Sequence, residues 1–207
     1  MIKLAPLNIR MFTNGRPVIS PAYSANEKVL RDFLNNHPYN KKTEEIFVKI
    51  TLIDFTYSTQ LKRLINDSGV HQLADFISQI NFDSRISKYD PNLVTEIAKK
   101  ATNCNLFSFA TKYCSLHNRL VWGKNYYSIY DNVVATLFSK YTRVENARNS
   151  SSKVIKKKEI ECWRANGEYD NFNKAIGSFL DLINVEESIY PERRNIFDGF
   201  LWEQRKK

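Results

Sequence analysis

Residues that break regular structure are scarce in this chain. Its 207 residues include only 6 glycines and 6 prolines, about 3% of each, against about 7% glycine and 5% proline in typical proteins. An all-β sandwich or barrel needs many more tight turns, so this scarcity favours helices. Hydrophobic residues make up 43% of the chain and charged residues 26%, which supplies a core and excludes intrinsic disorder. We predict an all-α protein.

Hydrophobic residues recur at helical spacing through most of the sequence. Ile46, Ile50 and Ile53 share one face of a helix that begins at Thr43. The pair Asp90-Pro91 is a typical helix start, a capping carboxylate before a proline. We expect roughly eight to ten helices, with breaks at Ser58-Thr59, 67–69 and 117–129, an extended arm over 1–24 and a polar linker within 141–152.

Several classes of site have no supporting motif in the sequence. The three cysteines, Cys104, Cys114 and Cys162, are odd in number and form no Cys-x-x-Cys pair. We therefore expect no disulfide framework, and we expect the protein to occupy a reducing compartment. No apolar run approaches the roughly 18 residues that cross a bilayer, and we expect a cytoplasmic protein with no membrane partner. Glycine-rich phosphate loops, HExxH and GxSxG motifs do not occur. We expect no metal and no cofactor.

The charge balance points to a polyanionic partner. The chain has 31 Lys and Arg against 22 Asp and Glu, a net charge of +9, and its pI is about 9.4. Between 140 and 158, Glu145 is the only acid among seven basic residues. We expect the lysines at the end of this run to bind DNA phosphates; the alternative is an ordinary solvated face. These lysines are Lys156, Lys157 and Lys158.

Two ionisable residues stand out between Asp90 and Lys140. Lys112 lies within an apolar and aromatic helix, and Asp131 precedes the helix that begins at Asn132. Each has a common structural explanation, because lysine stems often extend from such a face to solvent and aspartate often caps a helix. The alternative is chemical: a desolvated lysine with a lowered pKa is a nucleophile, and an aspartate at a helix N-terminus stays ionised.

The order of these residues resembles a known pattern. Thr111-Lys112, followed by Ser128-Ile129-Tyr130-Asp131-Asn132-Val133 on the next helix, resembles the helix-hairpin-helix DNA glycosylase superfamily, which includes 8-oxoguanine DNA glycosylase and endonuclease III. The resemblance covers about 43–141, and YSTQ, SFATKYCSLHN and SIYD resemble a divergent bacterial branch. It implies that Lys112 is the nucleophile and that Asp131 stabilises the sugar cation. No four-cysteine cluster is present, so the iron–sulfur type is excluded.

The resemblance also implies where DNA is bound. Residues 46–65 are similar to the superfamily's helix-break-helix element that enters the duplex, which places Tyr57, Ser58 and Thr59 at the wedge. The hairpin that grips the backbone corresponds to Asn105, Ser108, Ala110 and Thr111, with Ser108 and Ala110 where the superfamily usually has glycine. Four aromatic residues are candidates for stacking on an extruded base, with ordinary core packing as the alternative for each. They are Trp122, Tyr126, Tyr127 and Trp202.

The resemblance implies a two-lobed helical fold with the catalytic residues in the cleft. We expect a single glycosylase-like domain over 1–207, with one lobe over 43–142 and the other over 1–42 and 143–207. The expected function is excision of a damaged or modified base after base flipping, with AP-lyase activity as an optional second step. The partner is duplex DNA bound by a monomer. Two alternatives stay open: a non-catalytic DNA-binding module, and an enzyme of this fold acting on RNA or a nucleotide.

Overall fold

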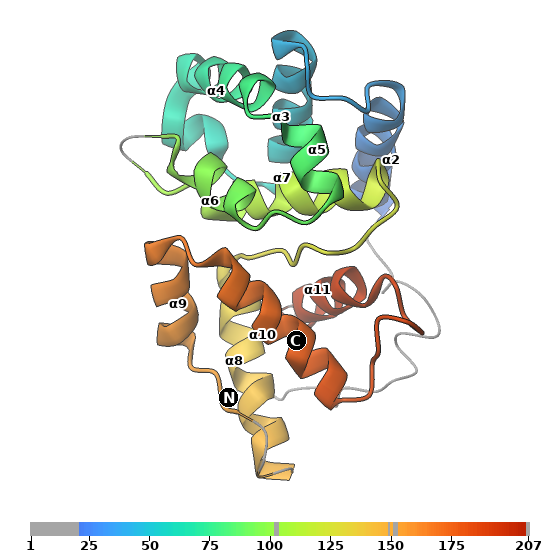
Figure 1. The fold of residues 1–207 in the computed structure, drawn as a ribbon, viewed down its shortest axis with the longest axis vertical. Coiled ribbons are helices and arrows are strands. Elements are labelled where there is room, and N and C mark those ends of the chain that lie inside the picture. Colours follow the sequence, from blue (N-terminus) through green and yellow to red (C-terminus); the bar gives the residue numbers. More distant parts are fainter. Residues whose placement is uncertain (1–20, 102–103, 149, 151–152, 206–207) are drawn as a thin grey trace. The chain divides into compact units, whose positions relative to one another are not determined.

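The computed structural model describes residues 21–101, 104–148, 150 and 153–205. Within these ranges the chain is helical and contains no strand, which confirms the all-α prediction (Figure 1). No helix in the described part of the chain is long and apolar enough to cross a membrane. The helices are α2 (Pro21–Asn36), α3 (Thr43–Tyr57), α4 (Leu61–Gln79), α5 (Phe82–Ser87), α6 (Asn92–Lys99), α7 (Phe107–Leu120), α8 (Asn132–Arg148), α9 (Lys157–Asn166), α10 (Tyr169–Leu182) and α11 (Arg193–Gln204).

The chain divides into two compact units. Unit 1 comprises Met1–Val18 and Ser128–Lys207, and unit 2 comprises Ile19–Tyr127. These limits differ from the expected lobes, which placed the divisions at 43 and 142. Helix α2 belongs to unit 2 because it packs against α3 and α7 and buries Leu30 and Leu34 completely. Helix α8 belongs to unit 1 because it packs against α9 and α11.

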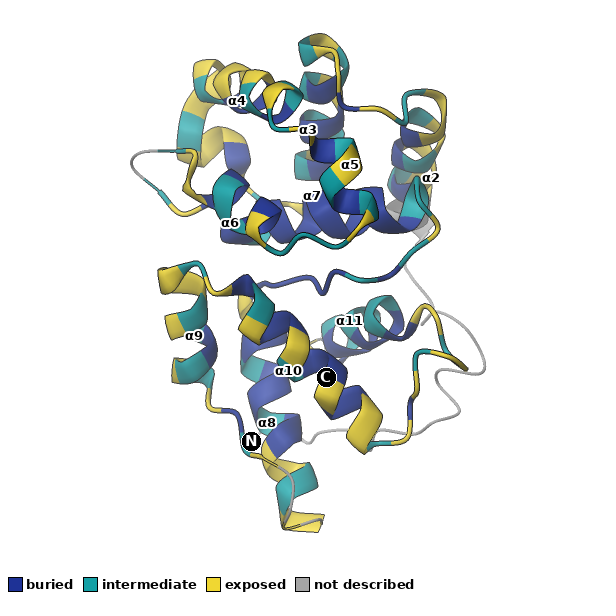
Figure 2. Ribbon diagram, in the orientation of Figure 1, coloured by how far each residue is buried: buried dark blue, intermediate teal, exposed yellow. Residues whose placement is uncertain are grey.

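Unit 2, coloured blue to yellow-green in Figure 1, is organised around α7. This helix contacts α2, α3, α5 and α6, and 12 of its 14 residues are buried, which makes it dark blue in Figure 2. Its sequence explains the position, because apolar and small residues occupy every side of FSFATKYCSLHNRL. Helices α3 and α4 form a second closely packed pair.

Unit 1, coloured yellow to red in Figure 1, holds helices α8 to α11 around an aromatic core. The ring of Phe138 on α8 meets Phe179 on α10 edge to face at 5.4 Å between centroids, and Phe197 on α11 at 6.2 Å. Phe179 and Phe197 also lie 5.6 Å apart. Each such contact adds about 0.5–1.5 kcal/mol to the burial of the rings, so three aromatic residues tie three helices together.

Local periodicity misplaces several boundaries. Helix α7 continues to Leu120, through the start of the expected loop, because His117 and Asn118 are buried and bonded within unit 2. Helix α8 continues to Arg148 because Tyr141 and Thr142 are buried, and 149, 151 and 152 of the expected linker lie outside the described residues. The pattern also does not predict α5 or α9, since one is short and the other strongly charged. Of the expected arm, 1–20 lie outside the described residues, and α2 already begins at Pro21.

Helix α4 contains a sharp kink one residue before the expected break. Asn66 has non-helical backbone angles, φ 53° and ψ −178°, and its Oδ1 accepts the N–H of Gly69 at 2.9 Å. Asn66 therefore caps the second part of the helix. A Cβ on Gly69 would lie 2.8 Å from the Cβ of Ile65, so glycine is required here by the close approach of the two segments.

Candidate functional site

Asp131 is held on both carboxylate oxygens at the start of α8 in unit 1. Its Oδ1 accepts the backbone N–H of Val134 at 2.8 Å, and its carbonyl oxygen accepts that of Ala135 at 2.9 Å. The second oxygen, Oδ2, accepts the indole N–H of Trp202 on α11 at 2.8 Å. Asp131 is therefore the N-cap of α8, as the structural explanation predicts, and it has a tertiary partner besides. Only 7% of the residue is exposed, so its orientation is fixed by the protein.

The segment that leads to Asp131 is hydrogen-bonded to side chains of α10 and α11. The backbone N–H of Ser128 donates to Asn173 Oδ1 at 2.8 Å, and the Ser128 carbonyl accepts the hydroxyl of Tyr169 at 2.9 Å. The Ser128 hydroxyl accepts from the Arg194 guanidinium at 2.9 Å. A Cβ on Gly177 would lie 2.7 Å from Arg194 Nη2, so this glycine leaves room for the guanidinium. These contacts constrain the backbone of the segment before Asp131.

Lys112 lies on α7 in unit 2 and is only 4% exposed. Its Nζ donates to the hydroxyl of Ser108 at 3.2 Å, one helical turn earlier. Thr111 is fully buried, and its hydroxyl donates to the Ser108 carbonyl at 3.1 Å. A lysine whose stem merely extends to solvent would leave its ammonium group exposed, which does not describe Lys112. The two catalytic candidates, Lys112 and Asp131, thus belong to different units.

Helices α6 and α7 pack together as a helical hairpin in unit 2. The N–H of Leu106 donates to the carbonyl of Ala98 at 2.9 Å and closes the hairpin. Asn105 is exposed, and its Oδ1 accepts the N–H of Phe107 at 3.0 Å. Ala110, expected to contact DNA, is fully buried, and its N–H donates to the Leu106 carbonyl at 2.9 Å. Its amide is engaged in the helix. Of the four residues expected to grip the backbone, Asn105 is exposed, Ser108 is half-buried, and Ala110 and Thr111 are buried.

The junction between α3 and α4 is shaped by Asp54. This carboxylate accepts the Leu61 N–H at 2.9 Å and also the Thr59 hydroxyl, and the left-handed residues Ser58 and Gln60 have φ values of 48° and 57°. Tyr57, expected to fill the gap in the duplex, is half-buried. Phe55 is the exposed ring, with 71% of the residue accessible. The sequence signal for Phe55 is its position off the buried stripe of Ile46, Ile50 and Ile53.

Three of the four aromatic candidates lie in unit 2 and one in unit 1. Tyr127 is 1% exposed, and its hydroxyl exchanges hydrogen bonds with the backbone N–H and C=O of Asp90, so it has a structural role. Trp122 and Tyr126 are half-buried, and Tyr126 lies 5.4 Å from the Lys124 ammonium. Trp202, in unit 1, donates to Asp131. The structure therefore joins one predicted base-stacking residue to one predicted catalytic residue.

The basic residues before and within α9 remain accessible. Lys156 and Lys158 are exposed and Lys157 is half-buried. Lys157 lies 3.5 Å from Glu161, and Lys153 pairs with Glu159 at 2.8 Å. Surface pairs of this kind contribute about 0–1 kcal/mol, so they do not prevent these lysines from binding an anion.

Unit 2 also contains a buried network of polar side chains that the sequence did not predict. Lys49 Nζ donates to the Tyr39 carbonyl at 2.7 Å, and Asn40 Oδ1 accepts the Tyr113 hydroxyl at 2.7 Å. His117 Nδ1 lies 2.9 Å from the Tyr113 carbonyl and is therefore the protonated nitrogen, while Nε2 is buried without a hydrogen-bond partner. Burial lowers the pKa of Lys49 to about 8 and that of His117 to about 3.

Two comparisons place this chain among known proteins. Residues 12–121, just over half of the chain, match the family HI_0787_N, described as an N-terminal domain. The chain belongs to this family. It is also 27% identical, over 161 residues, to an uncharacterized protein of Haemophilus influenzae (strain ATCC 51907 / DSM 11121 / KW20 / Rd), a match that covers 73% of this chain and 71% of that protein. No solved structure matches the chain significantly.

The HI_0787_N match agrees with the division of the chain. Its residues, 12–121, correspond closely to unit 2, Ile19–Tyr127. Lys112, the hairpin and the α3–α4 junction lie inside the matched range, whereas Asp131, Trp202 and the basic α9 lie beyond it. The family domain is thus the unit built around α7, and the tryptophan–aspartate pair belongs to the second unit. In the described residues, no group of three or more His, Cys, Asp or Glu side chains is placed to hold a metal ion.

Proposed function

We propose that this HI_0787_N family member is a DNA glycosylase of the helix-hairpin-helix type, which excises a damaged or modified base. The observation that supports the proposal most is the Asp131 carboxylate, held by a helix N-terminus and by the Trp202 indole N–H. Excision builds positive charge on the deoxyribose as the base departs. A fixed anion stabilises that charge without reorganising during the reaction. The two-lobed arrangement of the superfamily is part of the same proposal.

Lys112 supplies the nucleophile in this proposal. Its amine, once neutral, attacks C1′ of the target nucleotide as the bond to the base breaks and the base leaves with the electron pair. Loss of the amine proton and opening of the sugar give a Schiff base between Nζ and C1′, from which β-elimination can cleave the strand. The buried position of Lys112 beside Ser108 supports this role, because it keeps the amine from bulk water.

DNA is the partner that the charge of the chain favours. The net charge of +9 attracts phosphates, and Asn105, Lys156 and Lys158 are accessible side chains in the expected contact regions. A glycosylase also has to extrude its target from the stack, at a cost of a few kcal/mol. The exposed ring of Phe55 joins Tyr57 as a residue able to fill the vacated space, since both lie at the end of α3, just before the turn stabilised by Asp54.

Borohydride trapping tests the proposal directly. Purified protein is mixed with labelled duplexes that each carry one modified base, and sodium borohydride reduces any Schiff base to a stable adduct. We expect a covalent complex with wild type and none with Lys112→Gln. Lys99→Gln, an exposed lysine at the end of α6, is the matched control and keeps full trapping. Trapping by Lys112→Gln at the wild-type level would transfer the chemistry to another amine, and excision without trapping would point to water as the nucleophile.

A non-catalytic DNA-binding module is the second candidate. It is favoured by Ser108 and Ala110 in the hairpin, where glycine would let backbone amides approach a phosphate, and by the engagement of the Ala110 amide in the helix. This candidate predicts DNA binding by wild type with no base release from any duplex in the panel. It also predicts that Lys112→Gln and Asp131→Asn bind DNA as wild type does.

A further inference from the structure

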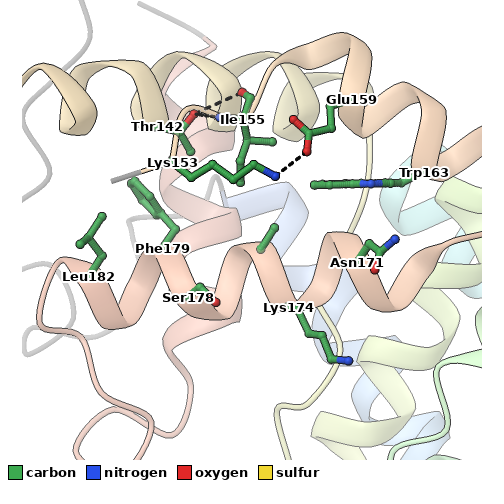
Figure 3. A pocket seen from close by; sticks show the side chains of 11 residues that line it. Thr142, Lys153, Ile155, Glu159, Trp163, Asn171, Lys174, Ser178, Phe179 and Leu182 are labelled. Atoms are coloured by element: carbon green, nitrogen blue, oxygen red, sulfur yellow. Dashed lines mark hydrogen bonds and ion pairs between the residues drawn. The ribbon is translucent and has the colours of Figure 1, made fainter. Parts of the chain in front are cut away.

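Unit 1 contains a groove that none of the expected site residues lines. It lies among α8, α9, α10 and the extended segment that precedes α9, and its volume is about 460 Å³. Figure 3 shows the residues around it. They are Thr142, Lys153, Ile155, Glu159, Trp163, Asn171, Lys174, Ala175, Ser178, Phe179 and Leu182. A space of this size accommodates a nucleotide or a comparable small molecule.

The groove has one aromatic wall and an apolar floor. Trp163 comes from α9, and Figure 3 shows its indole ring edge-on, with Asn171 of α10 beyond one face. Trp163 is half-buried, so part of the residue stays accessible to a ligand. Phe179, Ile155 and Leu182 continue the apolar surface along the groove. An indole face beside apolar side chains favours a flat ligand that stacks.

Charged side chains lie along the rim. Lys153 Nζ meets Glu159 Oε1 at 2.8 Å, shown as a dashed line in Figure 3, and Lys174 Nζ meets Asp170 Oδ2 at 2.6 Å. The two lysine side chains are 72% and 71% exposed. Exposed pairs are weak, so either ammonium group can turn to a phosphate at little cost. The Glu159 carboxylate is an acceptor of the kind that binds the amino group of cytosine.

The approach to the groove is basic as well. Glu159 and Trp163 are one helical turn apart on α9, and Lys156, Lys157 and Lys158 stand at the start of that helix. The positive end of the helix dipole lies at the same end. A strand whose phosphates follow these lysines would bring a base toward the Trp163 ring. A stacking platform next to a basic track is the arrangement by which proteins bind single-stranded nucleic acid.

We propose that this groove binds an unstacked nucleotide of a DNA single strand. The base stacks on Trp163, Glu159 accepts a hydrogen bond from its amino group, and Lys153 and Lys174 contact the flanking phosphates. The proposal shares with the proposed function only the premise that DNA is the partner. Single-strand binding needs neither Lys112 nor Asp131.

Fluorescence anisotropy with a labelled deoxycytidine oligomer of about 12 nucleotides tests the groove, since single-strand binding sites span about 4–16 nucleotides. We expect Trp163→Ala to weaken binding by about tenfold or more and Trp163→Phe to restore most of it, because stacking on an aromatic ring is worth about 1–3 kcal/mol per base. Tyr39→Ala, an aromatic residue in unit 2 that is 54% exposed, is the matched control and leaves the affinity unchanged. Circular dichroism checks that each variant is folded.

Three further probes separate the sources of binding. An oligomer of abasic nucleotides should bind wild type and Trp163→Ala equally, because it offers phosphates and no base. A thymidine oligomer should bind less tightly than the deoxycytidine oligomer, and Glu159→Gln should narrow that difference. Complete competition by free dCMP at equal nucleotide concentration would overturn the single strand as the ligand and assign the groove to mononucleotides. Unchanged affinity of Trp163→Ala for the deoxycytidine oligomer would overturn the stacking role itself.

The glycosylase and the groove can fail separately. If no duplex is excised or trapped but Trp163→Ala weakens single-strand binding, the groove proposal stands without the enzyme. If trapping depends on Lys112 while Trp163→Ala binds as wild type, the enzyme stands without the groove.

Discussion

Units 1 and 2 bury polar side chains in two different ways. In unit 2, His117 and Lys49 are completely buried, with the His117 ring in contact with both Tyr113 and Phe82, and burial lowers both pKa values. In unit 1, Asp131 and Ser128 are also buried, and each accepts a hydrogen bond from a side chain of α10 or α11. In unit 2 burial favours the neutral forms of two cationic side chains, whereas in unit 1 directed N–H and O–H donors take the place of water around a carboxylate and a serine.

This difference separates two kinds of buried polar residue. A group whose charge is suppressed makes stability depend on pH, because the unfolded chain binds protons that the folded chain does not. A carboxylate held by directed N–H groups is suited to interact with a developing positive charge. We therefore expect substitutions in unit 2 to act on the free energy of unfolding, and substitutions around Asp131 to act on activity beyond their effect on stability.

The largest effect is expected for Asp131→Asn. The amide oxygen can still accept the Val134 N–H, so the cap of α8 is retained, but the amide nitrogen cannot accept from the Trp202 indole. We expect the free energy of unfolding to fall by about 1–3 kcal/mol. If the proposed glycosylase mechanism holds, single-turnover excision should fall by about 10²–10³-fold or more, because the anion proposed to stabilise the sugar cation is gone.

Trp202→Phe is the matched control for that measurement. It removes the same hydrogen bond and leaves the Asp131 charge in place, so its loss of stability should be similar and its loss of activity much smaller. Equal losses of activity in the two variants would make Asp131 a helix cap with a tertiary anchor and no catalytic role. In that case the buried polar residues of both units would contribute to stability alone.

The next effect is the acid sensitivity of unit 2. Because the folded pKa of His117 is about 3, against an ordinary value of 6.5, the unfolded chain binds a proton between these pH values and the folded chain does not. The contribution of His117 to stability is therefore complete above about pH 6.5 and is lost as the pH falls toward 3, a change on the order of a few kcal/mol. Urea unfolding at a series of pH values should show a shallower acid slope for His117→Phe than for wild type.

Lys49 should make the stability of unit 2 depend on pH in the alkaline range as well. Its folded pKa is about 8, against an ordinary 10.5, because burial outweighs the attraction of Asp83 and Glu45. Between these pH values the unfolded chain holds the proton that the folded chain has released, so this residue makes stability rise with pH over that window. Lys49→Met should remove the rise. An unchanged pH profile in both variants would show that neither group controls the titration of unit 2.

The smallest effect is expected on the salt dependence of DNA binding. This measurement compares the accessible basic side chains of the two units. Replacing Lys156, Lys157 and Lys158 with alanine should reduce the slope of log K against log salt by about 0.9 per lost phosphate contact, roughly 2–3 in all. Discrimination between target and normal bases should barely change. Filter binding at several salt concentrations gives both quantities.

The corresponding set in unit 2 is Lys62, Arg63 and Lys100, which line a second groove of about 310 Å³. Arg119 and Lys124 are weaker candidates, because Arg119 is buried against Glu27 and Lys124 donates to the Ser87 carbonyl. If alanine at the unit 2 set changes the salt slope and alanine at Lys156, Lys157 and Lys158 does not, the phosphate footprint belongs to unit 2.

The sequence by itself determined the helical class and most helix starts. Scarce glycine and proline exclude a turn-rich sheet protein, and short-range signals such as Thr43 before an apolar stripe, or Asp131 before α8, act within one or two helical turns. The expected cap at Asp131 is present for that reason. For Lys112 the sequence left two explanations open, a side chain that extends to solvent and a desolvated amine, and only the packing around α7 shows that the residue is buried beside Ser108.

Only the tertiary structure decided which distant side chains meet. The Asp131–Trp202 bond joins residues 71 positions apart, and Arg194 reaches Ser128 across 66. Such pairs depend on how α10 and α11 pack against α8, and no local period encodes that packing. The same holds for α7, which extends into the expected loop because Asn118 donates to the Ile86 carbonyl, 32 positions away, and His117 is buried against Phe82. His117 and Asn118 have a low intrinsic helix preference, but differences in helix propensity amount to only about a few tenths of a kcal/mol per residue. The free energy gained by packing these side chains is larger, so the helix continues.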